Sequence, residues 1–71
     1  MSLRLTINGS EKSFAASQWP GSVGELLEQM KIDQATVVAE VDGEIIERRA
    51  FADTLLQDGQ RIELIRFVGG G

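Results

Sequence analysis

The sequence predicts an α+β fold in which one main helix covers one face of a mixed sheet of four to five strands. Three observations support this prediction. Short segments with alternating apolar and polar residues occur at both ends and in the middle of the chain, and Asn-Gly or Asp-Gly pairs mark turns beside them. One intervening segment has apolar residues at helical spacing. The apolar stripe of such a helix and the apolar face of such a sheet have to bury each other.

The first strands form a predicted hairpin. Leu3, Leu5 and Ile7 alternate with polar residues, and Asn8-Gly9 then supplies a tight-turn signal before a second strand that contains Phe14. These residues therefore predict two antiparallel strands at the start of the fold.

The helix is predicted to begin after a Pro-Gly loop. Ser22 is suited to cap it, and Glu25 three residues later completes a capping-box pattern. Residues 23–30 then place apolar side chains at helical spacing, so we expect the helix to end near Lys31. Trp19, just before this helix, is expected to cover one end of the core.

The second half of the chain predicts another hairpin and a last strand. Residues 37–41 alternate, and Asp42-Gly43 marks a turn before Ile45 and Ile46. No strand alternation appears between residues 48 and 56. After a turn at Asp58-Gly59, Ile62 and Leu64 alternate with Glu63, Ile65 and Phe67, which predicts a last strand that runs almost to the carboxyl end. The resulting order, ββαβ(β)β, is the layout of a β-grasp, or ubiquitin-like, roll.

The amino-acid composition argues against catalytic and metal-binding functions. The chain has 71 residues with neither Cys nor His, so it lacks a thiolate nucleophile, an imidazole base and the commonest zinc ligands. We therefore expect a single small domain over residues 1–68 followed by a flexible glycine tail at 69–71. We expect it to be no enzyme, with no catalytic residue, metal or cofactor of its own.

The net charge and the sequence pattern argue against two classes of partner, nucleic acids and membranes. The formal net charge of -4 argues against nucleic acid, whose phosphates are bound by Lys and Arg. No signal peptide begins the sequence, and no apolar run approaches the length of a membrane span. We therefore expect a cytoplasmic protein without a membrane partner.

The last strand has two faces. If Ile62 and Leu64 point toward the helix, Ile65 and Phe67 point outward, where Val38 from the preceding strand can join them. Scattered exposed apolar residues are ordinary on small domains. A contiguous apolar surface instead marks an interface. Both interpretations stay open at this point.

The chain finishes with Val68-Gly69-Gly70-Gly71. Glycine has no Cβ, so a run of it can thread a narrow channel in another protein and present a carboxylate there. A frayed end is the alternative interpretation. The tail follows the last strand without a spacer, and this favours the functional interpretation.

The chain resembles the bacterial thiamin-pathway sulfur carrier family, small ubiquitin-like proteins that end in Gly-Gly. The resemblance runs along nearly the whole chain, and the residues that carry it are Ile7-Asn8-Gly9, Val23-Gly24-Glu25-Leu26-Leu27, Val41-Asp42-Gly43-Glu44-Ile45-Ile46, Asp58-Gly59, Ile62-Glu63-Leu64-Ile65 and Phe67 to Gly71. Asp42 stands where the family often has Asn, and Glu47 stands where Pro is common.

The resemblance implies a carrier cycle. An ATP-dependent adenylating enzyme would activate the Gly71 carboxylate, a persulfide donor protein would supply sulfur, and the resulting thiocarboxylate would serve a thiazole synthase. Gly69 and Gly70 would provide reach, while Val38, Ile65, Phe67 and Val68 would dock the partner. Arg48 falls on an Arg of the family and is expected to pair with a local carboxylate.

Two other functions stay in competition. One is a sulfur carrier of a different pathway, such as the small subunit of molybdopterin synthase, which shares the fold and the tail. The other is a ubiquitin-like interaction module or protein modifier that carries no sulfur. Detection of a thiocarboxylate separates the carriers from the module.

Overall fold

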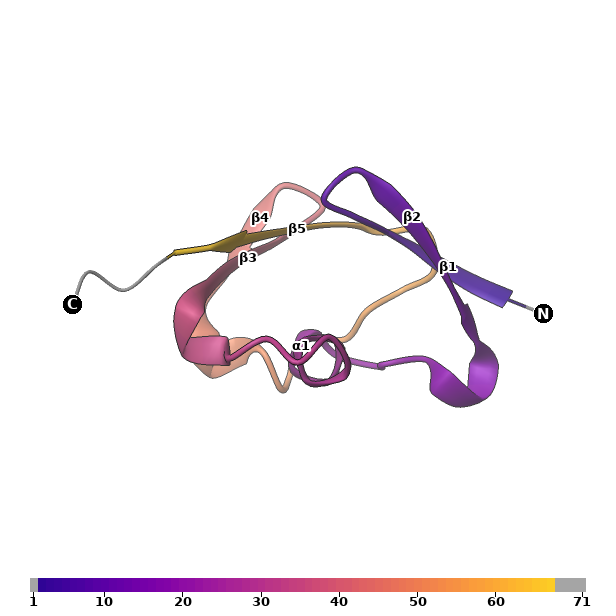
Figure 1. The fold of residues 1–71 in the computed structure, drawn as a ribbon, viewed down its shortest axis with the longest axis horizontal. Coiled ribbons are helices and arrows are strands. Elements are labelled where there is room, and N and C mark those ends of the chain that lie inside the picture. Colours follow the sequence, from indigo (N-terminus) through magenta and orange to yellow (C-terminus); the bar gives the residue numbers. More distant parts are fainter. Residues whose placement is uncertain (1, 68–71) are drawn as a thin grey trace.

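The computed structural model describes residues 2–67, and in it a curved sheet arches over a single α-helix (Figure 1). The strands are β1 (Ser2–Ile7), β2 (Ser10–Ala15), β3 (Val37–Val41), β4 (Glu44–Ile46) and β5 (Arg61–Arg66). The helix α1 spans Val23–Gln29, and short 3₁₀ helices span Ala16–Gln18, Gln34–Thr36 and Arg48–Ala50. The predicted α+β class is confirmed.

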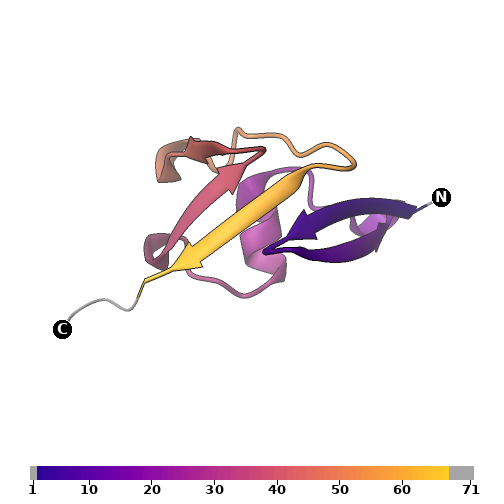
Figure 2. The same cartoon turned by 90° about the horizontal axis from the view of Figure 1, so that it is seen from above.

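The sheet has the order β2-β1-β5-β3-β4. The central pair, β1 and β5, is parallel, and the other neighbouring strands are antiparallel. Seen from above, β5 runs diagonally across the middle of the molecule, between the two hairpins (Figure 2). The sheet is the predicted mixed β-grasp sheet, and five is the upper of the two strand numbers predicted.

Both predicted hairpin turns adopt left-handed backbone conformations at their two central residues. The φ angles are 50° at Asn8 and 82° at Gly9, and 50° at Asp42 and 86° at Gly43. Positive φ at both positions matches the right-handed twist of the strands that the turn joins, and Asn, Asp and Gly tolerate it best. The turn residues therefore fix the register of both hairpins.

The start of α1 uses half of the predicted capping box. The Ser22 hydroxyl accepts a hydrogen bond from the Glu25 backbone N–H at 3.2 Å. The reciprocal bond is replaced, because the Ser22 N–H donates to the Pro20 carbonyl at 2.8 Å. The helix ends at Gln29, slightly before the predicted end, and Lys31 has a φ of 59° that stops it from continuing.

The segment between β4 and β5 packs into the core and bonds to the start of α1, a role that its sequence pattern did not reveal. Phe51 and Leu56 are buried in the core. The N–H of Val23 donates to the Thr54 carbonyl at 3.0 Å, and the N–H of Gly24 donates to the Phe51 carbonyl at 2.9 Å. The first N–H groups of a helix have no acceptor within the helix itself. In this protein the carbonyls of the segment between β4 and β5 accept hydrogen bonds from them.

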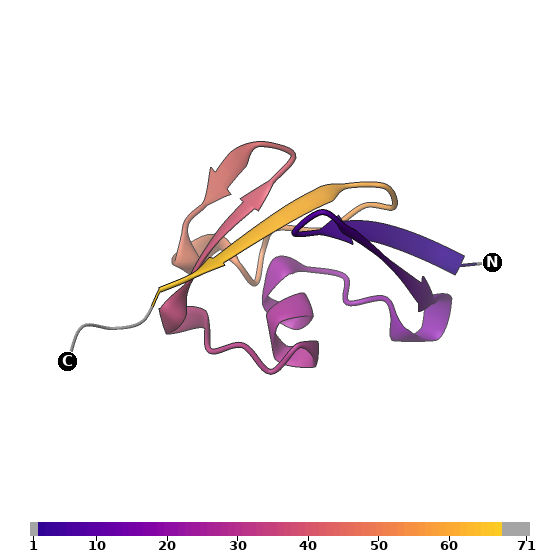
Figure 3. The same cartoon turned by 45° about the horizontal axis from the view of Figure 1, so that its top comes forward.

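Figure 3 shows in an oblique view how the sheet lies over α1, and the buried side chains of both form the core. Trp19 is half-buried and packs edge-to-face on Phe14, with ring centroids 5.7 Å apart and an interplanar angle of 89°. This position confirms that Trp19 covers one end of the core. The buried apolar residues are Leu5, Ile7, Phe14, Val23, Leu26, Leu27, Val37, Ala39, Val41, Phe51, Leu56, Ile62 and Leu64.

The single α-helix has seven residues. Neither it nor any other helix among residues 2–67 has the length and apolar character needed to cross a membrane.

Candidate docking face

An apolar surface lies on the side of the sheet that faces away from α1. We call it the outer patch, and it consists of Val38 on β3, Ile45 on β4, Ile65 on β5 and Phe67 directly after β5. Ile45 is 70% exposed, Ile65 53% and Phe67 50%, whereas Val38 is half-buried. Among the described residues, the patch contains most of the large apolar side chains that are strongly exposed.

The pleat of β5 explains why the patch forms. Ile62 and Leu64 are buried beneath the sheet, so Glu63 and Ile65 point to the other side. Val38 lies directly opposite Ile65 in the antiparallel register of β3 and β5, and cross-strand partners share a face. The predicted outward placement of these side chains is confirmed, and their role in docking stays a prediction.

Phe67 follows the last residue of β5 but remains part of the same ladder. Its backbone N–H donates to the Thr36 carbonyl at 3.0 Å, which continues the pairing of β3 and β5 by one residue. The backbone of Phe67 therefore keeps the register of β5, and its side chain lies on the same face as Ile65. Val68, Gly69, Gly70 and Gly71, which the sequence analysis assigns to docking and to the tail, lie outside the described residues.

Two exposed apolar side chains were missed by the sequence analysis. Ile45 joins the patch because it lies opposite Glu40, a residue of the outer face, while Ile46 turns toward the core. Alternation between Ile45 and Ile46 was the signal that could have separated them. Leu55, 73% exposed, lies instead in the segment that pairs with Ser22 beside the start of α1.

Two carboxylates adjoin the outer patch. Glu40 on β3 lies directly opposite Glu63 on β5, and on its other side it faces Ile45 on β4. The ion pairs formed within residues 2–67 are Arg4–Glu11 and Glu47–Arg49, so neither of the two carboxylates is neutralised by one. Like charges directly opposite each other destabilise a sheet. The outer face thus combines exposed apolar side chains with two facing carboxylates that form no ion pair within residues 2–67.

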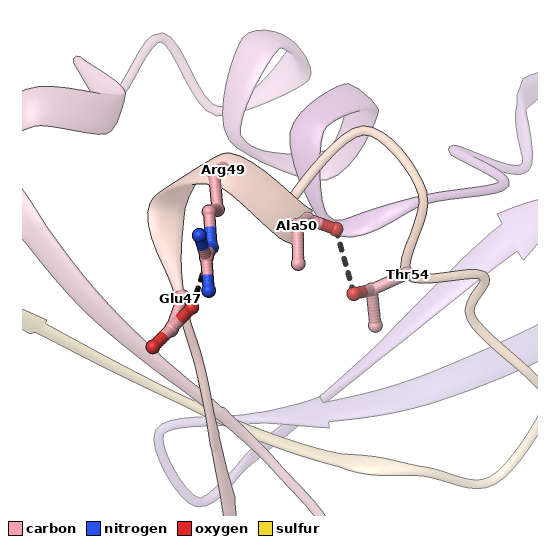
Figure 4. Close-up of polar contacts among 4 residues, drawn as sticks. All are labelled: Glu47, Arg49, Ala50 and Thr54. Carbon is pink, nitrogen blue, oxygen red and sulfur yellow. Dashed lines mark hydrogen bonds and ion pairs between the residues drawn. The ribbon is translucent and has the colours of Figure 1, made fainter.

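The ion pair expected near the second hairpin forms from a different arginine. Arg49 Nε lies 2.8 Å from Glu47 Oε2, and both side chains are largely exposed (Figure 4). Arg48, for which a local carboxylate partner was predicted, takes part in no ion pair within the described residues. The nearby Thr54 hydroxyl donates to the Ala50 carbonyl at 2.7 Å and secures the turn that follows.

Two shallow hollows lie elsewhere on the described surface, one beside Glu25 and Glu28 on α1 and one beside Lys12 and Gln18. Nowhere in residues 2–67 do three acidic side chains gather in a way that could hold a metal ion.

Comparison with known proteins places this geometry in a family context. The chain matches the model of the ThiS family over residues 5–71. It is 32% identical over 69 residues to the sulfur carrier protein ThiS of Escherichia coli strain K12, a match that covers 97% of this chain and 100% of that protein. It is 30% identical over 67 residues to the sulfur carrier protein ThiS of Bacillus subtilis strain 168, covering 94% and 98%.

A longer protein contains a similar stretch. The chain is 35% identical over 69 residues to a thiazole synthase of Paramagnetospirillum magneticum, and the match spans 97% of this chain but only 20% of that protein. Among solved structures, the crystal structure of the thiamine biosynthesis protein ThiS from Geobacter metallireducens has a TM-score of 0.78 and 38% sequence identity. That match covers 97% of this chain and 100% of the other.

Proposed function

The chain belongs to the ThiS family, and on that premise we propose that it is a sulfur carrier for formation of the thiazole moiety of thiamin. The observation that carries the proposal is the end-to-end match to a sulfur carrier protein, 97% of this chain against 100% of the relative. A match to the family model that extends through residue 71 includes the terminal glycines on which the chemistry depends.

In this proposal Gly71 is the cargo site. A carboxylate oxygen of Gly71 attacks the α-phosphorus of ATP on an adenylating partner, pyrophosphate leaves, and an acyl-adenylate forms. Carboxylates are poor electrophiles, and the bond to AMP supplies a leaving group. The partner contributes the cation and the cationic side chains that stabilise charge on the phosphates.

Sulfur then enters from a persulfide donor protein. Its terminal sulfur attacks the acyl carbon and AMP leaves, so the carrier and the donor become joined through an acyl disulfide. A second thiol, on the donor or another thiol protein, cleaves that S–S bond and is itself oxidised to a disulfide. The carrier is released as a thiocarboxylate, whose sulfur is the nucleophile for a thiazole synthase.

The domain around the tail acts as a handle rather than a catalyst. The outer patch and Val68 dock the partner, while Gly69 and Gly70 give the slender reach that brings Gly71 to buried chemistry. The carboxylates of Glu40 and Glu63 favour a partner surface with basic side chains, because complementary charge steers association. The carrier domain is residues 1–68, and a cytoplasmic location is part of the same proposal.

The adenylation step is tested by isotope exchange. The carrier, the adenylating enzyme, ATP and magnesium are incubated with labelled pyrophosphate, and label returning to ATP is measured. The proposal expects exchange that requires the carrier and disappears when one residue is appended after Gly71. Exchange that is unaffected by the appended residue would contradict the assignment to Gly71, since the reacting carboxylate would then be that of the appended residue or of a side chain.

A further inference from the structure

One side of β5 loses its neighbouring strand before β5 ends. The pairing of β1 with β5 covers Thr6 with Arg61 and Ile7 with Ile62, after which β1 turns away at Asn8. On the other side, β3 stays paired with β5 as far as Arg66. From above, β5 continues past the tip of the β1–β2 hairpin (Figure 2).

The hydrogen bonds show which backbone groups face this open edge. The Phe67 N–H and the Arg61 carbonyl bond to the chain of β3, which assigns the odd-numbered residues of this strand to the β3 side. The Ile62 carbonyl accepts from the Asn8 N–H, and the Leu64 N–H donates to Asn8 Oδ1, which assigns the even-numbered residues to the β1 side.

Two residues therefore present an unpaired edge. The carbonyl of Leu64 and both the N–H and the carbonyl of Arg66 point to the side where β1 has ended, and no residue in the range 2–67 bonds to them. Such an edge is a template for an additional strand. It adjoins Ile65 and Phe67 of the outer patch on the same stretch of backbone.

We propose that this edge, at Leu64 and Arg66, accepts an extended segment of the adenylating partner as an added β-strand. The inference rests on the proposed function and specifies how the partner is engaged. The four residues after Phe67 reach roughly 14 Å at most, so the partner's reaction centre has to come close to the end of β5. Glycines provide no side chains to set the position of the tail, and backbone pairing just before them sets it instead.

A second copy of this chain is a poorer occupant of the edge. Each copy carries a net charge of -4, so two copies repel each other. The open edge comprises only Leu64 to Arg66, which is too short to bury the area of a stable dimer by itself. A partner that covers the outer patch as well gains that area from the adjoining apolar side chains.

The test uses the full chain and hydrogen exchange. In the complex with the adenylating enzyme, the Arg66 amide should exchange about tenfold or more slowly than in the carrier alone, as a newly formed backbone bond predicts. The Phe67 amide, which already bonds to Thr36, serves as the internal control and should be protected in both states. An Arg66 amide that exchanges equally fast in a saturated complex would overturn the proposal.

Substitutions at Arg66 distinguish a backbone hydrogen bond to the partner from burial of this residue by the partner. Arg66→Pro removes the edge N–H at a position where an edge strand tolerates proline, while Arg66→Ala removes only the side chain. The proposal expects R66P to weaken binding to the adenylating enzyme about tenfold or more beyond the effect of R66A, consistent with loss of a backbone hydrogen bond. Equal binding by the two variants would overturn it.

Replacement of the Ile65–Arg66 amide by an ester removes the same N–H. This variant takes the place of R66P in the binding test if R66P does not fold. Carrier-dependent pyrophosphate exchange by the unmodified chain keeps the two proposals distinguishable. If the unmodified chain supports no exchange, the proposed function fails. If it supports exchange and the ester variant binds normally, only the added strand fails.

Discussion

The side chain of Asn8 replaces a missing strand residue beside Leu64. Its Oδ1 accepts the Leu64 backbone N–H at 2.7 Å, while its own N–H donates to the Ile62 carbonyl at 2.9 Å. The same residue occupies the first central position of the β1–β2 turn, with a φ of 50°. A single asparagine thus shapes a hairpin turn and anchors the strand that leads to the tail.

Changing Asn8 separates these two roles. Asn8→Gly retains the freedom to adopt positive φ but leaves the half-buried Leu64 N–H without its acceptor. We expect a loss of about 1–2 kcal/mol in the free energy of unfolding. Asn8→Asp keeps an acceptor oxygen and tolerates the turn, so it should remain near the wild-type value. Urea denaturation of both variants measures this, and equal stability of N8G and N8D would contradict the role of Oδ1.

The outer patch should matter for binding far more than for stability. Ile65→Ala and Phe67→Ala remove side chains that are about half exposed, so each should cost less than about 1 kcal/mol of stability. Leu64→Ala, in the core, should cost about 2–5 kcal/mol. Both patch variants should bind the adenylating enzyme more weakly, as titration calorimetry can measure.

Leu55→Ala provides the matched control for the patch, because Leu55 is even more exposed but lies beside the start of α1. It should leave binding unchanged. Equal weakening by L55A and I65A would show that exposed apolar area in general, and not the outer patch, drives association.

The facing carboxylates should lower the free energy of unfolding and strengthen binding to a basic partner surface. Glu63→Gln removes the repulsion from Glu40, so the free energy of unfolding should rise by about 0.2–1 kcal/mol at low salt, with a smaller gain at high salt. The same change should weaken binding to a basic partner surface. Glu44→Gln, opposite Val41, carries the same charge change without a facing carboxylate and should alter neither property. A variant E63Q that loses stability would contradict this account of the pair.

Two glycines near the start of α1 should respond oppositely to alanine. At Gly24 a Cβ would make ordinary contacts with Gln34 and Ala52 at 3.4–3.5 Å, so Gly24→Ala should stabilise the protein by about 0.5–1 kcal/mol. At Gly21 the φ is 76° and a Cβ would lie 2.8 Å from Glu25 Oε2, so Gly21→Ala should lower the melting temperature. Thermal unfolding of both variants decides, and a stabilised G21A would contradict the assigned backbone strain.

Local pattern predicted most of the fold because turn chemistry and alternation agree in this chain. Asn8-Gly9 and Asp42-Gly43 specify their turns, and the spacing of Val23, Leu26 and Leu27 specifies the helix. The segment from Arg48 to Leu56 could not be predicted, since its conformation depends on distant contacts. Its carbonyls satisfy the N–H groups at the start of α1, and Phe51 fills the core.

The candidate site was predicted in part for the same reason. Period-two alternation placed Ile65 and Phe67 outward, but the inclusion of Ile45 depends on its register against Glu40. The open edge beside Arg66 depends on where β1 stops relative to β5. Register between strands far apart in the sequence is a tertiary property that one strand's pattern does not contain.

The most direct test of the carrier function is mass spectrometry of the terminal residue. The chain is incubated with the adenylating enzyme, ATP and a persulfide donor, and the C-terminal fragments are then sequenced by mass. Fragmentation is essential, because oxidation of Met1 or Met30 adds nearly the same nominal mass as exchange of oxygen for sulfur. The account predicts sulfur in place of one carboxylate oxygen on Gly71. An unmodified Gly71 under conditions that thiolate an established sulfur carrier would contradict it.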